Sequence, residues 1–254
     1  MIIPISALYP RENRTRQYNP ATFGNECETW RSTYTENRPG MPQVLLVEQS
    51  PGSELLPHYH ASDQFQIFVQ GEGTLGKHRL QPISIHYTNR YTSYGPIIAG
   101  DNGIQYYVMR PSFDVLGYGQ YLYNSVMRDN LRRYNGRKRI LMADVALYPV
   151  NILQGFEGFS VTRCFGAGPE DPDSGFFADA ITLGPRTPYR APNPRSGGGQ
   201  IITVVQGSLL FNGTKMGERA AIAVTEEEEK AISFVAGDLG LHALVLQYPK
   251  RTIS

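Results

Sequence analysis

Short apolar runs separated by turn-forming residues dominate the sequence. Glycine, proline, asparagine or serine bounds each run, and valine, isoleucine, tyrosine and phenylalanine are frequent inside the runs. This pattern is typical of β-strands. The predicted strands lie at 44–48, 64–73, 83–88, 104–109, 140–145, 181–183, 200–207 and 243–248. Many short strands without alternating helices favour an all-β sandwich or barrel.

Two pairs of segments show that the chain contains an internal repeat. The segment 64–71, QFQIFVQG, resembles 200–207, QIITVVQG. Further on, 99–111, AGDNGIQYYVMRP, resembles 236–249, AGDLGLHALVLQYP. The two matches occur in the same order and at nearly the same spacing, which indicates duplication. We therefore expect two similar β domains of roughly 100 residues each.

One segment between the repeats has helical periodicity. Tyr123, Met127, Leu131 and Tyr134 recur at intervals of three or four residues, which predicts a helix over 120–134. We expect this helix to link the two domains. The predicted division gives an N-terminal barrel, a helical linker and a C-terminal barrel at 1–115, 116–138 and 139–254.

The composition is that of an ordinary globular protein, and it limits the classes of partner. Apolar residues make up 41% of the chain and charged residues 19%, and the formal net charge is +1. This balance gives no electrostatic reason to expect nucleic acid or a membrane surface as a partner. No apolar run reaches the roughly 18 residues that cross a bilayer.

The cysteines and the beginning of the chain both favour a reducing compartment. Cys27 and Cys164 are the only cysteines and lie far apart, so we expect two free thiols, with a single bridge as the alternative. The first residues are interrupted by Pro4 and Pro10 and contain no basic region, so no signal peptide is predicted. The expected location is cytoplasmic.

Two histidines one residue apart carry the candidate chemistry. Side chains alternate along a strand, so His58 and His60 point to the same side and can bind one metal ion inside a barrel. Gln64 follows after a turn and can supply a third group from the next strand. Gly52 and Gly71 flank this segment. The segment therefore predicts a metal site in the first domain.

The spacing of these five residues resembles the first motif of the cupin superfamily, with Gln64 where the family usually has glutamate. The resemblance implies two jelly-roll β-barrels and a divalent transition metal. Tyr94 falls where the third histidine of the family's usual metal site would lie. Through the repeat, the two histidines correspond to Pro194 and Ser196 in the second domain. We therefore expect the second barrel to be structural.

The candidate site residues each have more than one predicted role. Gln64 is either a weak metal ligand or a strand residue hydrogen-bonded inside the barrel. Tyr94 and His86 either pack in the core or contact the metal or substrate, and His86 can also act as a general acid or base. We take Tyr94 and His86 as the candidate groups for proton transfer or substrate contact. The predicted metal ligands are His58, His60 and Gln64.

The leading functional hypothesis is a metal-dependent cupin enzyme that acts on a small organic molecule. An oxygenase is favoured, because open coordination positions suit joint binding of substrate and dioxygen. Imidazole ligands do not distinguish iron, zinc, nickel, copper and manganese. The alternatives are a metal-free isomerase or lyase that moves protons through histidine and tyrosine, and a non-catalytic cupin that binds a small ligand. Exposed barrel edges and the tyrosine-rich segment 9–34 also suggest either docking between the two barrels or a homodimer.

Overall fold

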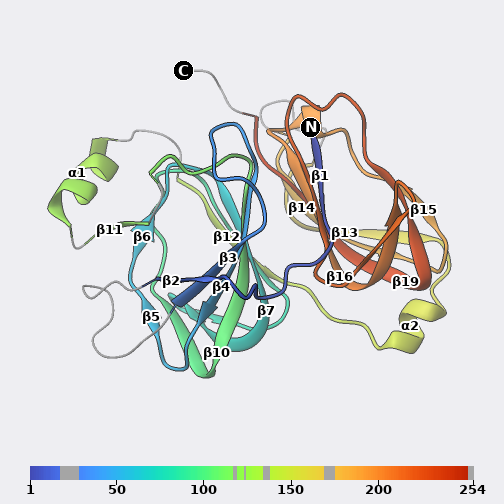
Figure 1. Ribbon diagram of the computed structural model, residues 1–254, viewed down its shortest axis with the longest axis horizontal. Coiled ribbons are helices and arrows are strands. Elements are labelled where there is room, and N and C mark those ends of the chain that lie inside the picture. The colour runs from blue at the N-terminus through green and yellow to red at the C-terminus, as the bar shows by residue number, and fades with distance from the viewer. Residues whose placement is uncertain (18–28, 117–118, 123, 134–137, 169–174, 251–254) are drawn as a thin grey trace. The chain divides into compact units, whose positions relative to one another are not determined.

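The chain folds into two β units, each built on one large antiparallel sheet (Figure 1). The computed structural model describes residues 1–17, 29–116, 119–122, 124–133, 138–168 and 175–250. The unit Tyr9–Val145 is termed the first barrel, and the unit formed by Met1–Leu8 and Ala146–Ser254 the second barrel. Strands predominate in both units, as the pattern of short apolar runs predicts.

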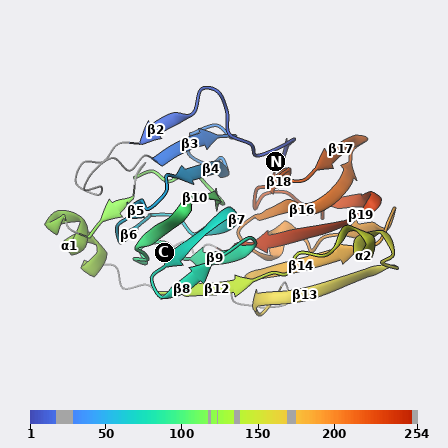
Figure 2. The ribbon, with the colours of Figure 1, turned by 90° about the horizontal axis from the view of Figure 1, so that it is seen from below.

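The first barrel contains a nine-stranded sheet and a separate two-stranded sheet. Its elements are β2 (Thr15–Gln17), β3 (Thr29–Thr33), β4 (Gln43–Gln49), β5 (Glu54–Leu55), β6 (His58–Tyr59), β7 (Gln64–Leu75), β8 (His78–Leu80), β9 (Ser84–Thr88), β10 (Ile97–Arg110), β11 (Gln120–Tyr121), α1 (Ser125–Arg133) and β12 (Ile140–Asp144). The large sheet has the order β12-β9-β7-β10-β4-β3-β2, with β5 paired to β10 and β8 paired to β7. Strands β2, β3 and β4 follow one another at one edge of this sheet (Figure 2). Strand β6 pairs with β11 in the small sheet.

The second barrel contains an eight-stranded sheet. Its elements are β1 (Ile2–Ile5), α2 (Val150–Gln154), β13 (Phe159–Gly166), β14 (Phe177–Leu183), β15 (Pro188–Arg190), the 3-10 helix η1 (Pro194–Ser196), β16 (Gln200–Phe211), β17 (Thr214–Gly217), β18 (Ala221–Val224) and β19 (Ser233–Gln247). The order is β1-β18-β16-β19-β14-β13, with β15 paired to β19 and β17 paired to β16. The repeated segments therefore occupy matching places, because β7 pairs with β10 in the first barrel as β16 pairs with β19 in the second.

Strand alternation makes the interior of the first barrel apolar in one part and polar in another. Tyr106 and Val108 of β10 belong to the buried core, and Arg110 continues the same face. Phe68 of β7 also belongs to this core, and Gln66 and Gln64 continue its face. Both glutamines and the arginine are buried. Polar side chains on neighbouring strands therefore meet inside this barrel.

The interior of the second barrel is mainly apolar. Its core cluster includes Phe177, Ile181, Ile202, Val245 and Phe234, all of them buried. The counterparts of the polar pair on β7 and β10 are two buried glutamines, one on β16 and one on β19, which bond to each other at 2.8 Å. A pair of glutamines thus stands where the first barrel has a glutamine and an arginine.

The boundaries between the units differ from the predicted ones at 115 and 138. Strand β1 pairs with β18, so the first eight residues belong to the second barrel. Figure 1 shows β1, drawn in blue, among the strands of the second barrel. Strand β12 pairs with β9, so the chain stays in the first barrel as far as Val145. Pairings between distant strands set these boundaries, and local sequence carries no signal for them.

The predicted helix is present but shorter than 120–134. Gln120 and Tyr121 form β11 and pair with β6, so α1 begins only at Ser125. It lies inside the first barrel and is not a linker. Tyr123 and Tyr134, which helped to predict it, lie outside the described residues. No helix in the described ranges is long and apolar enough to cross a membrane.

The cysteine prediction is tested for one of the two residues. Cys164 on β13 carries a free thiol, and burial raises its pKa. Cys27 lies outside the described residues. Cys164 is therefore a thiol with little tendency to ionise at neutral pH.

Candidate active site

The two histidines of the predicted motif lie together in the first barrel. His58 begins β6 and forms a β-bridge with Tyr94, and the carbonyl of His60, one residue beyond the strand, accepts a hydrogen bond from the backbone of Tyr91. Both side chains are buried, with 3% and 5% exposure. Their ring centroids are 5.2 Å apart and the rings are nearly perpendicular. The expected alternation along the strand therefore brings the two imidazoles to one place.

Each imidazole is held by a hydrogen bond at Nδ1. His58 Nδ1 lies 2.8 Å from the carbonyl oxygen of Leu56, which can only accept. His60 Nδ1 lies 2.6 Å from Oδ2 of Asp114, a residue that the sequence analysis did not select. The Nδ1 atoms therefore donate, and in a neutral imidazole Nε2 then carries the lone pair.

Burial keeps both histidines neutral at pH 7. Burial lowers the pKa of His58 to about 4. The pKa of His60 is also lowered, first by burial and then by the positive charge of Arg110. Burial alone would raise the pKa of Asp114, but the hydrogen bond from His60 and nearby positive charges bring it below its ordinary value. At neutral pH the pair is a neutral imidazole that donates to a carboxylate.

Gln64 lies in the interior, but its amide is already engaged. Its oxygen accepts hydrogen bonds from Nε and from one terminal nitrogen of Arg110, at 3.1 and 3.0 Å. Its nitrogen donates to the hydroxyl of Tyr94 at 2.6 Å. Arg110 also donates to the side-chain oxygen of Gln43. An amide oxygen that accepts two N–H groups has used both lone pairs. Of the two roles predicted for Gln64, that of a hydrogen-bonded strand residue fits these contacts better than that of a metal ligand.

Tyr94 packs between the candidate histidines. Its ring centroid lies 4.5 Å from that of His58 and 5.0 Å from that of His86. The side chain is 4% exposed, and burial raises its pKa. The phenol therefore keeps its proton at neutral pH and accepts the hydrogen bond of Gln64 while that proton remains available to donate.

His86 on β9 belongs to the same interior. Its Nδ1 lies 2.7 Å from the amide oxygen of Gln66, the residue opposite it on β7. Burial lowers the pKa of His86 to about 3. Its Nε2 is buried and has no hydrogen-bond partner among the described residues. A buried nitrogen in this state is costly unless a ligand supplies a donor.

The residues present fit a metal ion only in part. His58 and His60 have the hallmark of ligands, because a carbonyl and a carboxylate hold Nδ1 and leave Nε2 for an ion. A third protein ligand is missing, since the oxygen of Gln64 is engaged and the described residues contain no group of three or more His, Cys, Asp or Glu that could hold a metal. The buried guanidinium of Arg110 next to this position also disfavours a cation.

Two residues of this site escaped the sequence analysis for different reasons. Arg110 lies two residues beyond Val108 and so shares the inward face of β10. The alternation of side chains along a strand could have identified it from the sequence. Asp114 lies in a loop after β10, and no local spacing relates it to His60, 54 positions away. In the second barrel, Pro194 and Ser196 lie in η1 and supply no imidazole.

Comparison with known proteins rests on structure. No family model matches the chain, and no curated protein matches it in sequence. A Nostoc punctiforme protein described as a candidate dioxygenase is 10% identical with a TM-score of 0.63, and the match covers 100% of this chain and 83% of that one. The Escherichia coli pirin YhhW, in complex with nickel(II), is 13% identical with a TM-score of 0.55, over 99% and 100% of the two chains. Bacillus subtilis oxalate decarboxylase, which has Mn(II) centres, is 12% identical with a TM-score of 0.53, over 99% and 78%.

These similarities span both units of the chain, and they agree with the motif around His58 and His60 and with the internal repeat. At identities of this size they concern the fold. The chain therefore has the two-barrel, jelly-roll fold of the cupin superfamily.

Proposed function

We propose that the first barrel contains the active site of an enzyme that catalyses proton transfer within a small organic molecule, as an isomerase or lyase does. One observation carries the proposal: His60 and Asp114, both buried, are joined by a 2.6 Å hydrogen bond. A carboxylate in this position fixes the tautomer of the imidazole and stabilises the imidazolium that forms when it accepts a proton. His60 Nε2 is the base in this proposal.

The proton balance involves His60 and Tyr94. His60 Nε2 takes a proton from a carbon next to a carbonyl group, and the electron pair of the broken C–H bond moves to the carbonyl oxygen. The phenol of Tyr94 keeps its proton at neutral pH because of burial and can donate it to that oxygen, which gives an enol and a phenolate. In an isomerisation the phenolate takes back a hydroxyl proton of the enol while His60 returns its proton to carbon. In an elimination the leaving group departs with the proton of His60, and the phenolate takes back its proton as the carbonyl group re-forms.

The charge of the surroundings supports a substrate that becomes negative during the reaction. Arg110 and Arg31 both lower the pKa of Tyr94 through their positive charge, although burial outweighs them. The same two charges act on His58. Fixed positive charge near a developing enolate lowers the barrier to its formation. The proposed substrate class is therefore a small carbonyl compound.

A metal-dependent reaction is the second candidate, and a specific observation favours it. The Nδ1 atoms of His58 and His60 both donate to fixed acceptors, and the ring centroids lie 5.2 Å apart, so both Nε2 atoms can face one ion. A divalent transition metal bound there would supply a Lewis acid, and in an oxygenase a binding place for dioxygen. Two solved structures with a similar fold contain nickel(II) or Mn(II).

The two candidates are separated by metal content and proton exchange. The untagged protein is incubated with iron, nickel, manganese or zinc, dialysed and analysed for bound metal. Exchange of the α-hydrogens of a panel of 2-oxo acids and keto sugars is then followed by NMR in D₂O. Acid–base chemistry predicts exchange that survives EDTA and is lost in His60→Ala. The matched control is Asp238→Asn, which changes an exposed ion pair in the second barrel.

Near-stoichiometric metal, combined with activity that EDTA abolishes, would reject the acid–base proposal in favour of the metal-dependent one. Exchange that persists in His60→Ala would reject both assignments of the site. Loss of metal in the double variant His58→Ala, His60→Ala with the fold retained would assign those two imidazoles as ligands.

A further inference from the structure

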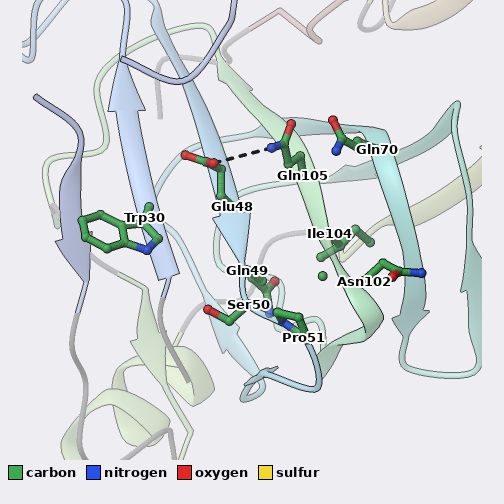
Figure 3. Close-up of a pocket in the computed structure, with 10 residues that line it drawn as sticks. Trp30, Glu48, Gln49, Ser50, Pro51, Gln70, Asn102, Ile104 and Gln105 are labelled. Atoms are coloured by element: carbon green, nitrogen blue, oxygen red, sulfur yellow. Dashed lines mark hydrogen bonds between the residues drawn. The ribbon is translucent and has the colours of Figure 1, made fainter. Parts of the chain in front are cut away.

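A pocket lies in the first barrel, on the sheet face opposite the candidate active site. Trp30, Glu48, Gln105 and Gln70 line it together with the turn after β4 and the bend of β10 (Figure 3). Its volume is about 190 Å³. Because the inward residues of β4 and β10 alternate with Glu48 and Gln105, these side chains point to the outer face.

Strand register places the four side chains in one row across the sheet. Trp30 on β3 is opposite Glu48 on β4, Glu48 is opposite Gln105 on β10, and Gln105 is opposite Gln70 on β7. Residues in directly opposed positions have neighbouring side chains. The row therefore presents an indole, a carboxylate and two amides side by side, as Figure 3 shows.

The bend of β10 shapes one end of this pocket. The pairing of β10 with β7 shifts register both before and after the pair of residues Ile104 and Gln105. Gly103 has a positive φ of 72°, and a Cβ there would lie 2.6 Å from the carbonyl oxygen of Gln49. Only glycine permits this close approach of the bend to the turn after β4. The irregularity turns Asn102 to the margin of the pocket.

The corresponding row of the second barrel is covered by its own chain. Register there aligns Ser160, Thr182, His242 and Gln206 across β13, β14, β19 and β16. The ring of Tyr148 packs on His242 at 5.0 Å, and its backbone N–H and C=O each bond the side-chain amide of Gln206 at 2.8 Å. In the second barrel Tyr148 thus covers part of this row, whereas the row of the first barrel lines a pocket.

The charge of the pocket favours a neutral ligand. Glu48 lies 3.6 Å from the guanidinium of Arg14, which also lies 4.8 Å over the ring of Trp30. Glu48 also accepts a hydrogen bond from Gln105 at 3.5 Å. The positive charge of Arg14 therefore largely balances the negative charge of Glu48, and a cationic ligand would be repelled by Arg14.

We propose that this pocket binds a neutral polyhydroxylated ring, such as one sugar unit. Hydroxyl groups both donate and accept, which matches the amides of Gln70, Gln105 and Asn102 and the carboxylate of Glu48. The indole of Trp30 lines the pocket and can contact the C–H groups of the ring. A pocket of about 190 Å³ holds one ring and no more. The site is separate from the proposed chemistry at His60.

The test uses the protein's own fluorescence, because Trp30 is the only tryptophan of the chain. The full-length protein is titrated with D-glucose, D-galactose, D-mannose and myo-inositol to roughly 30 mM, and separately with ethylammonium chloride. The proposal predicts a saturable fluorescence change with at least one polyol and a Kd on the order of 1 mM. Gln105→Leu should raise that Kd about tenfold or more, since its hydrogen bonds are lost. His60→Ala and the exposed-site control Gln154→Leu should leave it unchanged.

Three results would overturn the proposal. No saturable change with any of the four polyols would reject a polyol site. A response to ethylammonium alone would reassign the pocket to cations. An unchanged Kd in Gln105→Leu would place the bound sugar elsewhere. Sugar binding is measured in His60→Ala as well as in the wild type. The sugar-site proposal can therefore be judged even if the acid–base proposal fails.

Discussion

Replacement of Asp114 by asparagine tests the central contact of the candidate active site. The side chains are nearly equal in size, and an asparagine oxygen can still accept from the backbone N–H of Leu116, which lies 3.1 Å from Oδ1 in the structure. The change therefore removes one negative charge with little change in packing. With its oxygen toward Leu116, the asparagine turns its amide nitrogen toward His60 and donates to Nδ1, so the imidazole adopts the other tautomer.

The magnitude follows from the type of hydrogen bond that is lost. Hydrogen bonds to charged groups contribute about 1.5–3 kcal/mol and neutral ones about 0.5–1.5 kcal/mol, so Asp114→Asn should reduce the free energy of unfolding by about 1–2 kcal/mol. Asp114→Ala should cost about 2–4 kcal/mol, because the buried Nδ1–H of His60 would then lack an acceptor. Without the carboxylate the imidazolium is less stable, so proton exchange should fall by roughly 100-fold or more.

Three measurements check this prediction. Urea denaturation gives the free energy of unfolding, ¹⁵N NMR of the imidazole gives the tautomer of His60, and α-hydrogen exchange gives the rate. The control Asp238→Asn alters a surface pair in which both side chains are more than 70% exposed, so it should change stability by less than about 1 kcal/mol. Wild-type stability and an unchanged tautomer in Asp114→Asn would refute the role assigned to Asp114.

Three further predictions concern the surroundings of the site. His86 has a pKa of about 3 in the folded protein and an ordinary value of 6.5, so the unfolded chain binds more protons between these values and stability should fall as pH decreases from about 7 to 4. Urea denaturation across this range should show a loss of several kcal/mol, roughly 1.4 per pKa unit, that His86→Gln reduces; a flat profile would contradict the argument. Gly119→Ala would place a Cβ 2.7 Å from the ring of His58 and should cost roughly 1–3 kcal/mol in thermal or urea unfolding, whereas Gly217→Ala, with open space around it, should not. Arg110→Met should cost about 2–4 kcal/mol by the same assay, because the buried amide oxygens that it binds lose their donor, and a stable variant would show that they find other partners.

Much of the fold is already determined by local sequence. The predicted strands at 44–48, 83–88 and 140–145 nearly coincide with β4, β9 and β12. The repeat correctly predicts two related β units, because matching segments form equivalent strand pairs in both. Strand β10 is longer than predicted, since its glycine-rich bend continues the pairing with β7 and does not end it.

Local sequence likewise predicts only part of the candidate site. Period-two alternation brings His58 and His60 together, and that pattern is local. Spacing predicts neither the acceptor of His60 nor the pairing of Gln64 with Arg110, although it places Arg110 on the inward face of β10. Asp114 reaches His60 from a loop, and Arg110 reaches Gln64 from the neighbouring strand β10. Whether an inward polar residue ligates, donates or accepts depends on which neighbour the strand register places beside it.

By itself, the sequence determined the strands, the duplication and the position of two imidazoles on one side of a strand, because each depends on residues close together in the chain. Only the tertiary structure decided that β1 pairs with β18 more than 200 positions away, that Arg110 occupies the oxygen of Gln64, and that a carboxylate holds His60. The physical reason is that burial of the apolar faces decides how the strands pack. The polar groups carried inside must then find partners among whatever side chains the register brings near, and no local pattern encodes that choice.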